Sequence, residues 1–363
     1  MEFLRTLYNE LMSFFGVGPL LDLIRTGNYH SLLTLDGFLN VCRPLMPLLL
    51  LIEIVRALIY RQFDMLNYRT TFLIYVFNRF VSRFISIAAV GFSILLFQRA
   101  AILRSSLTWY WFIYGYVIWE FAHFVYHYLA HKVRLLWCLH STHHAPESMN
   151  LGVSYAHFFL EAPYADLIRT SICILAGVSP PTLYLIMFID GFWGTFIHVG
   201  EHFMRDGRLG FFQRVILTPS HHRVHHARNP LYMDTNFCNL LNIWDHLLGT
   251  WQPEVKEVKI EYGITRRMNP NNFLDAYFGE IGALWRDVRR APGLRNKIAY
   301  MVMPPGWSHT GDHHTARRIR REFLEHFHPH PSSHERTQEP EANPGIRPGH
   351  RDGRSQHHWF GRL

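Results

Sequence analysis

Cysteine is scarce in this sequence, and its cysteines lie far apart. The chain of 363 residues contains four, Cys42, Cys138, Cys173 and Cys238, and none forms a CxxC pair. This spacing argues against a disulfide scaffold, a thiolate zinc finger and an iron–sulfur site. The sequence also lacks an internal repeat and the glycine patterns GxGxxG and the P-loop, so we do not expect a nucleotide-binding fold.

Charged residues are also few. They make up 18% of the chain against 48% hydrophobic residues, which excludes global disorder, a collagen-like repeat and a coiled coil. Lys and Arg number 36 and Asp and Glu 28, so the net charge is 36 − 28 = +8 with neutral histidines. The basic run at 317–321 follows apolar segments, a pattern typical of contact with anionic headgroups, so no nucleic-acid partner is expected.

Long apolar stretches occupy the first two thirds of the chain. The stretches 45–60, 71–97 and 107–128 are candidates for the helices of about 20 residues that cross a bilayer. Their tryptophans and tyrosines are typical of membrane–water boundaries. A fourth stretch, 167–197, is interrupted at 177–181 by Gly-Val-Ser-Pro-Pro, which predicts a helical hairpin that enters and returns.

These patterns predict an all-α protein, a multi-pass membrane helical bundle with a cytoplasmic histidine-box cap. The expected parts are amino-terminal membrane helices at 1–106, a catalytic domain at 107–262, a polar helical region at 263–331, and a disordered tail at 332–363 rich in Pro, Arg, Gly, His and Glu. We expect an integral protein of the bacterial cytoplasmic membrane, or of the endoplasmic reticulum in a eukaryote. The positive-inside rule places its histidine-rich site on the cytoplasmic side.

Histidine is the abundant residue that carries the chemistry. There are 25 histidines, and 14 of them lie between positions 120 and 246. His127 and His131 form an HxxxH pair, and two HxxHH boxes begin at His140 and His222. Residues three and four apart are neighbours on a helix surface, so we predict that the three imidazoles of each box converge.

Two further histidines are candidates for the same site. His221 lies four residues before His225, and the predicted hairpin returns His198 to the side of the first box. A site of neutral imidazoles without thiolates suits iron, copper or zinc rather than magnesium or calcium. Eight or more ligands are too many for one tetrahedral zinc, so two metals are favoured. The apolar setting suggests a lipid substrate, and two redox metals suggest O2 activation.

At these residues the sequence resembles a known family. The three boxes, with the segments 136–151, 218–230 and 244–250, are similar to the fatty acid hydroxylase and sterol desaturase superfamily, and most closely to its alkylglycerol monooxygenase branch. The resemblance implies a membrane enzyme with two Fe2+ ions that hydroxylates or desaturates a lipid with O2. The metal ligands that it implies are His127, His131, His140, His143, His144, His222, His225 and His226, together with His198 and His221.

The resemblance leaves the substrate open. Lys132 stands where the branch commonly has an acidic residue, and Asn236-Phe-Cys238 replaces an expected Asn-Tyr-Gly. Ether lipids of the alkylglycerol type and bacterial amphiphiles such as ornithine lipids are both candidates. No electron-transfer domain is visible in the chain, so the expected partners are a lipid, the bilayer, and a separate electron-transfer protein or reductant.

Four polar residues near the boxes are candidates for orienting ligand imidazoles. Glu120 lies seven residues before the first box, and a simple helix-end carboxylate is an equal alternative. Asp234 and Asp245 can accept N–H groups from ligand rings, although Asp245 equally suits an anchor for the following turn. Asn236 is the fourth candidate. No catalytic residue is assigned beyond the metal ligands, and no other cofactor-binding residue is expected.

Two other functions fit parts of the sequence. His198-Val-Gly-Glu-His202 has the HxxEH pattern of inverted zinc peptidases, with Glu201 as the general base, but this function leaves both HxxHH boxes unused. A histidine-rich metal transporter is the third possibility, although the histidines lie in compact boxes rather than along membrane helices. The sequence therefore favours a membrane-bound di-iron oxygenase that hydroxylates a lipid C–H bond.

Overall fold

The computed structural model is helical throughout its described part. No strand forms there, and only two isolated β-bridges connect loop segments, so the all-α prediction is confirmed for this part of the chain. The predicted disordered tail at 332–363 lies outside the described residues. The described residues are 17–42, 44–269 and 272–327, with Arg5, Tyr8 and Met12.

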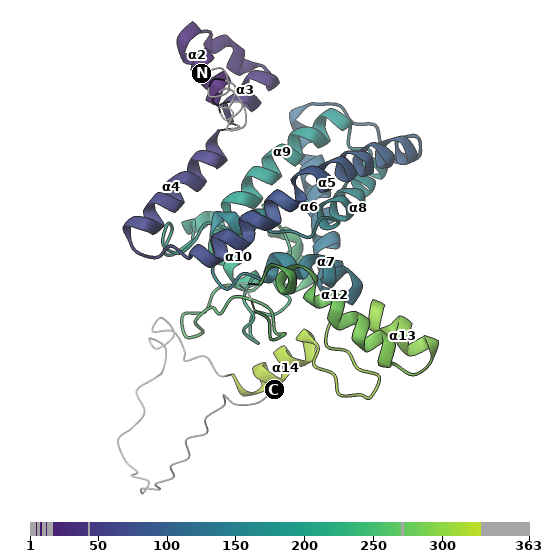
Figure 1. The fold of residues 1–363 in the computed structure, drawn as a ribbon. Coiled ribbons are helices and arrows are strands. Elements are labelled where there is room, and N and C mark those ends of the chain that lie inside the picture. The colour runs from purple at the N-terminus through teal and green to yellow at the C-terminus, as the bar shows by residue number, and fades with distance from the viewer. Residues whose placement is uncertain are drawn as a thin grey trace, which may run out of the picture. The chain divides into compact units, whose positions relative to one another are not determined.

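The helices are joined by connections of very different length, the longest of them between α9 and α10 and between α11 and α12 (Figure 1). Those of the amino-terminal half are α2 (Val17–Thr26), α3 (Leu35–Cys42), α4 (Leu45–Ile59), α5 (Met65–Phe97), α6 (Trp109–Lys132), α7 (Arg134–His144) and α8 (Glu161–Leu175). The remainder are α9 (Pro180–Phe196), α10 (Pro219–His225), α11 (Ile243–Leu248), α12 (Phe273–Arg290), α13 (Gly293–Val302) and α14 (Ala316–His326). Short 3-10 turns are η1 (Tyr29–Leu33), η2 (Gln98–Ala100), η3 (Leu151–Tyr155) and η4 (Gly210–Arg214).

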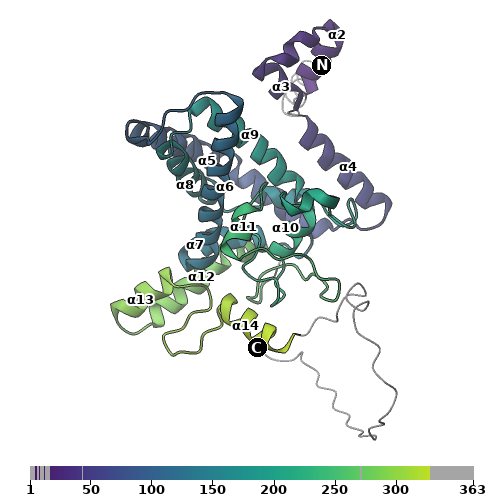
Figure 2. The same ribbon diagram turned by 180° about the vertical axis from the view of Figure 1, so that it is seen from behind.

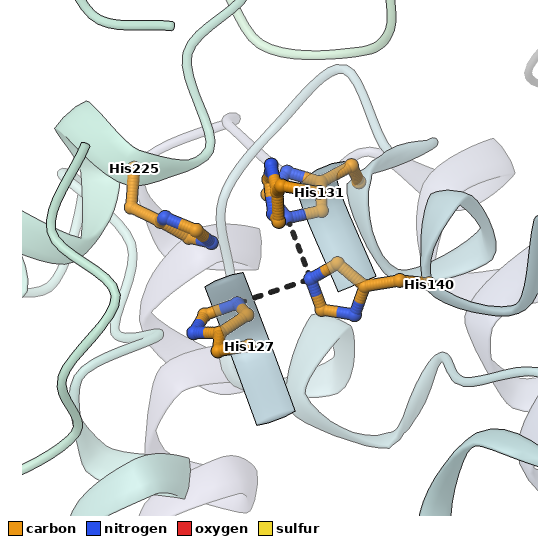
Figure 3. A group of neighbouring side chains, drawn as sticks. His127, His131, His140 and His225 are labelled. Carbon is orange, nitrogen blue, oxygen red and sulfur yellow. Dashed lines mark hydrogen bonds between the residues drawn. The ribbon is translucent and has the colours of Figure 1, made fainter. Parts of the chain in front are cut away.

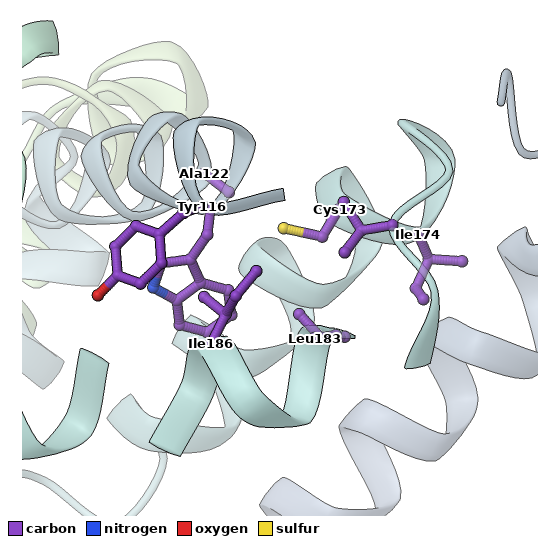
Figure 4. Packing of buried hydrophobic residues seen from close by; sticks show 8 residues of the cluster. Tyr116, Ala122, Cys173, Ile174, Leu183 and Ile186 are labelled. Atoms are coloured by element: carbon purple, nitrogen blue, oxygen red, sulfur yellow. The ribbon is translucent and has the colours of Figure 1, made fainter. Parts of the chain in front are cut away.

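A buried apolar cluster joins α6, α8 and α9 (Figure 4). Gly115 allows the close packing of α6 on α9, because a Cβ at this position would lie 3.0 Å from Cδ1 of Ile186. Burial of these side chains supplies the hydrophobic stabilisation that fixes the three helices. The buried members are Tyr116, Trp119, Ala122, Cys173, Ile174, Val178, Leu183 and Ile186.

The predicted break at 177–181 separates α8 from α9. Pro180 and Pro181 occupy the first positions of α9, where a missing N–H costs no helix hydrogen bond. Gly177 has a φ of 88°, and a side chain there would collide with the carbonyl of Leu103. The prediction of two helices joined by a turn is therefore confirmed.

The predicted membrane crossings are not confirmed. The stretches 45–60, 71–97 and 107–128 form α4, α5 and α6, but no helix in the described ranges is both long and apolar enough to cross a membrane. α4 has 15 residues, and polar side chains interrupt the apolar sequences of α5 and α6.

The packing brings the histidine-bearing helices to one end of the bundle. α5 lies along α8, and α6 contacts α7, α8 and α9. Both ribbon views place α7 and α10 at the same end of this group (Figures 1 and 2). Only Val133 separates α6 from α7, and its N–H still bonds to the carbonyl of Leu129, so the chain turns sharply between the HxxxH pair and the first HxxHH box.

Truncating Leu183 tests the packing of α9 on α6 and α8. This side chain is fully buried, so Leu183→Ala should lower the free energy of unfolding by about 2–5 kcal/mol through lost apolar burial and a residual cavity. The matched control is Leu95→Ala, since Leu95 is 83% exposed, and its effect should stay within about 0.5 kcal/mol. Equal thermal unfolding curves for the two variants would contradict this packing.

Candidate metal centre

Nine buried histidines form two groups at this end of the bundle. Within each group the candidate nitrogens all lie within 4.8 Å of one another, and no ring is more than 7% exposed. The rings of the first group point toward one another from α6, α7 and α10 (Figure 3). The first group contains His127, His131, His140, His144 and His225, and the second contains His143, His198, His222 and His226.

Each HxxHH box serves both groups, which differs from the prediction that its three rings converge. The first and last histidines of a box join one group, and the middle histidine joins the other. Consecutive helix residues are about 100° apart, so the residues three and four positions after the first lie on opposite sides of it. His140 and His144 join the first group and His143 the second, whereas His222 and His226 join the second and His225 the first.

The two groups are in direct contact. The ring of His144 in the first group stacks on that of His226 in the second, with centroids 4.3 Å apart and an interplanar angle of 24°. The ring of His225 in the first group likewise stacks on that of His222 in the second, with centroids 5.5 Å apart and an interplanar angle of 22°. The arrangement is therefore one continuous imidazole cluster with two foci, rather than two separate sites.

Backbone carbonyls fix the tautomer of several rings. Nδ1 of His127 lies 2.9 Å from the carbonyl oxygen of Phe237, and Nδ1 of His225 lies 2.8 Å from that of Thr235. Nδ1 of His198, which follows the end of α9, lies 2.6 Å from the carbonyl oxygen of Gly194 in that helix. A carbonyl has no proton to give, so each Nδ1 must donate, and the neutral ring then presents a lone pair at Nε2.

The facing Nε2 atoms require something between them. Nε2 of His127 and Nε2 of His140 are 3.0 Å apart, while Nδ1 of His140 lies 2.5 Å from a carboxylate oxygen of Glu161. In their neutral forms both rings use their proton on the outer side, so the inner nitrogens are two lone pairs that cannot hydrogen-bond. Imidazole nitrogens bind zinc-sized ions at about 2.1 Å, and two of them at right angles on one ion lie about 3 Å apart. The donor set therefore fits a metal ion.

Other buried nitrogens support the same conclusion. Nε2 of His131 and Nε2 of His225 have no hydrogen-bond partner among the described residues, although both are shielded from solvent. A buried polar atom without a partner costs free energy that ligation of a metal removes. Both atoms belong to the first group.

Glu161 at the start of α8 supports two histidines, and sequence analysis missed it. One carboxylate oxygen binds Nδ1 of His140, and the other lies 2.9 Å from Nδ1 of His157. Burial would raise the pKa of Glu161, but the two imidazoles outweigh it and hold that pKa far below its usual range. The spacing of four residues from His157 to Glu161 was the available signal.

His157 lies against the second group without joining it. Its ring stacks on that of His143, with centroids 4.3 Å apart and an interplanar angle of 11°. Burial opposes its protonation, but the carboxylate of Glu161 outweighs burial, and the pKa of His157 is raised. The ring of His157 therefore covers one face of His143.

Asp234 is the one predicted polar residue that contacts a ring of the groups. Its carboxylate lies 3.3 Å from Nδ1 of His131 and also binds the ammonium of Lys132. Burial raises the pKa of Asp234, but the imidazole and the ammonium lower it more, so that the net shift is downward. Lys132 thus neutralises the carboxylate that orients His131.

Glu120, Asp245 and Asn236 contact no ring of the groups, and for Glu120 and Asp245 the sequence had left a structural role as an equal alternative. Glu120 accepts three backbone N–H groups from residues 239–241, at 2.8–3.1 Å. Asp245 accepts the N–H groups of Phe237 and the next residue, both at 2.8 Å, and Asn236 donates to the carbonyl of Gln252. These side chains hold the loop whose Phe237 carbonyl orients His127, so they act on the ring through the backbone.

His221 lies outside both groups. Its Nδ1 accepts from the N–H and hydroxyl of Thr218, both at 3.3 Å, and so completes the capping box at the start of α10. Its ring lies 5.8 Å from that of Trp251 and does not pair with His225. His221 therefore serves the helix cap through Nδ1, and its ring lies outside the two groups that could hold a metal.

Arg223 lies inside the second box and was also missed. It is 1% exposed, and its guanidinium donates to the carbonyls of Val199 at 3.0 Å, Met204 at 2.7 Å and Arg205 at 3.2 Å. These residues belong to the loop that follows His198. Arg223 therefore fastens this loop to α10, which is a structural reason for an arginine within the HxxHH pattern.

The HxxEH pattern at 198–202 does not assemble a peptidase site. His198 joins the second group, but His202 does not, and its Nε2 lies 3.8 Å from a carboxylate oxygen of Glu53. Glu201 accepts a hydrogen bond from Tyr262 instead of facing His198. Residues 198–202 follow the end of α9 and are not helical, whereas the HxxEH pattern needs a helix to place its two histidines on one face.

Fold and site together define a helical histidine-box protein, and the comparison with family models agrees. Residues 112–250 match the model described as fatty acid hydroxylase. This segment contains all nine histidines of the two groups. The resemblance inferred from the boxes is therefore confirmed over this segment.

Similar curated proteins are lipid-modifying enzymes. The chain is 32% identical over 207 residues to alkylglycerol monooxygenase of Homo sapiens, covering 56% of this chain and 43% of that protein. It is 31% identical over 192 residues to the Xenopus tropicalis protein of the same name, with coverages of 52% and 40%. Ornithine lipid hydroxylase OlsE of Rhizobium tropici is 28% identical over 156 residues, with coverages of 43% and 46%. The chain thus spans less than half the length of these relatives, and no solved structure matches.

The metal-free protein should lose stability in mild acid. Burial, followed by neighbouring imidazoles, holds the pKa values of His143, His144, His225 and His226 well below the ordinary value of about 6.5. The unfolded chain then binds more protons than the folded one, so this stabilisation is complete above pH 6.5 and declines as the pH falls below it. Thermal unfolding of chelator-treated protein at pH 7.5 and 5.5 tests this; equal midpoints would contradict it.

Glu161→Gln should weaken metal binding without unfolding the protein. The amide keeps an acceptor for His140 but removes the negative charge that supports two rings, and loss of such a partner typically reduces metal affinity 10- to 100-fold. The matched control is Glu147→Gln, since Glu147 is half-exposed and lies 3.7 Å from the guanidinium of Arg228. Competition with a chromophoric chelator measures both affinities, and equal values would contradict a role for Glu161.

Proposed function

We propose that this protein is a membrane-bound di-iron oxygenase that hydroxylates a C–H bond of a lipid with O2. The observation that carries the proposal is the continuous cluster of nine buried imidazoles within a segment that matches the fatty acid hydroxylase model. Residues 107–262 are its catalytic domain. The balanced reaction is R–H + O2 + 2 electrons + 2 protons giving R–OH + H2O, with the electrons from a separate protein or reductant.

The ligands that we assign are the nine histidines of the two groups, without His221. Imidazole donors suit iron, copper and zinc, and the resemblance favours two Fe2+ ions. A redox-active iron pair supplies O2 reduction and C–H oxidation, which no acid or base of the chain can perform.

The chain's own residues prepare these nitrogens. Glu161, Asp234 and the backbone carbonyls hold the Nδ1–H groups on the outer side, so the Nε2 lone pairs point inward in a fixed orientation. Near-complete burial excludes bulk water and limits side reactions of an oxidising centre.

Exposed apolar side chains support a membrane location. Along α4 and α5 large side chains face outward, among them Ile59 at 70%, Phe84 at 73% and Leu95 at 83% exposure. Such extended apolar surfaces are characteristic of contact with a membrane or another protein. We assign the helices of residues 1–106 to a lipid bilayer, with the histidine cluster on the cytoplasmic side and the polar region 263–331 beyond it.

The substrate class in this proposal is an amphiphilic lipid. The names of the similar proteins specify alkylglycerols and ornithine lipids. The peptidase alternative is not favoured, because His198 and His202 do not share a site. A transporter is not favoured either, since the nine imidazoles form one compact cluster.

Removing one histidine from each box tests the function. His143→Ala and His222→Ala each delete a ring of the second group, so bound iron should fall at least twofold and hydroxylation should be lost. Metal analysis of purified protein and mass spectrometry of cellular lipids are the measurements, with a gain of one oxygen as the expected product. His30→Ala, an exposed histidine outside the cluster, is the control and should retain both properties. Full turnover in either box variant would overturn the proposal.

A further inference from the structure

A cavity of about 680 Å³ opens outside the histidine cluster, and neither the metal site nor the family resemblance assigns it a role. Its size falls within the range of small-molecule sites in proteins. One side of the cavity is formed by the end of α4 and the start of α5. The other side is formed by the loops 148–150 and 201–205. The side chains that line it are largely polar, in contrast to the apolar outer face of α4.

The loops that form the cavity wall are direct continuations of the metal-binding segments. Residues 148–150 follow His144 by four to six positions, and residues 201–205 follow His198 by three to seven. Arg223 of the second HxxHH box also binds the carbonyls of Val199, Met204 and Arg205. A molecule held in the cavity is therefore anchored on the same framework that positions the imidazoles.

The acidic groups of the cavity are already engaged. Asp64 caps α5 by accepting the N–H of Asn67 at 3.0 Å, and its second oxygen accepts the hydroxyl of Ser148 at 3.2 Å. Glu201 accepts the hydroxyl of Tyr262. Both carboxylates therefore have donors from the protein itself.

The basic groups retain free N–H capacity. Arg56 uses only Nε, which donates to the carbonyl of His202 at 2.9 Å, and its position over the ring of Tyr60 holds the guanidinium in place. Within the described part of the chain, the terminal nitrogens of Arg56 and the whole guanidinium of Arg205 have no hydrogen-bond partner. Nε2 of His202 is shielded from solvent and makes no hydrogen bond, although it lies 3.8 Å from a carboxylate oxygen of Glu53. Guanidinium groups with free N–H pairs match the two oxygens of a carboxylate or phosphate.

We propose that this cavity binds the anionic headgroup, carboxylate or phosphate, of the lipid whose chain enters the histidine cluster, with Arg56 and Arg205 as the binding residues. This inference rests on the proposed function, since it names the class of lipid that the oxygenase takes. It favours a charged or zwitterionic amphiphile over a neutral alkylglycerol, because a neutral headgroup supplies no negative charge to pair with the two guanidinium groups.

Binding to metal-free protein tests the cavity separately from the reaction. The full chain in neutral detergent is titrated, by calorimetry, with dodecyl phosphate, N-dodecanoylglycine, 1-O-dodecylglycerol and inorganic phosphate. At least one of the two anionic amphiphiles should bind tenfold or more tightly than the neutral ether, and the better of the two identifies the headgroup. Inorganic phosphate should bind at least tenfold more weakly than dodecyl phosphate.

The double variant Arg56→Gln/Arg205→Gln should reduce the affinity for the better anionic probe at least tenfold and leave that for 1-O-dodecylglycerol within twofold. The matched control is Arg61→Gln/Arg208→Gln, which removes two nearby arginines that do not line the cavity and should bind like the parent protein. Equal binding of neutral and anionic probes, unchanged binding in the Arg56/Arg205 variant, or equal binding of inorganic and dodecyl phosphate would each overturn the inference. Iron content and hydroxylation are measured independently, so failure here is distinct from failure of the proposed function.

Discussion

The histidine cluster depends on one constraint, the outward direction of the imidazole N–H groups. Carbonyls of Phe237 and Thr235 and the carboxylate of Glu161 take these protons, so the lone pairs of the opposite nitrogens face one another across about 3 Å of buried space. Without a cation between them these lone pairs repel each other and have no hydrogen-bond partner. With a cation, each ring has one partner for its N–H group and one for its lone pair. The buried carboxylates and tight loops around the cluster keep the N–H groups pointing outward and the lone pairs pointing inward.

The helical repeat then decides how the rings are distributed. Positions three and four after a histidine diverge by about 100° around the helix axis, so one short box cannot direct all three rings to a single ion. Two facing boxes can instead exchange their middle histidines, so that the middle ring of each box joins the group of the other box. The contact between His144 and His226 follows from this exchange. The two foci are therefore mechanically joined, and a shift of either α7 or α10 alters both.

Local sequence predicted the helices, the turn at 177–181 and the histidines that meet, because these features depend on spacings of a few residues. It did not predict the partners of the rings, because Phe237 and Glu161 reach His127 and His140 across 110 and 21 residues of chain. His221 was assigned to the metal because spacing alone cannot show that this ring serves a helix cap and lies outside both groups. The role of Glu120 in holding a distant backbone loop was likewise hidden, since backbone acceptors and donors carry no sequence signature.

The exchange of the middle histidines has a consequence for how the protein is made. When the ribosome has synthesised the chain as far as His144, four of the five rings of the first group exist, but His225 is still absent. Both groups are completed only when His226 has been added, 226 − 144 = 82 residues later. The two groups are thus completed late in biosynthesis, and a prematurely terminated chain that ends before α10 carries neither complete group.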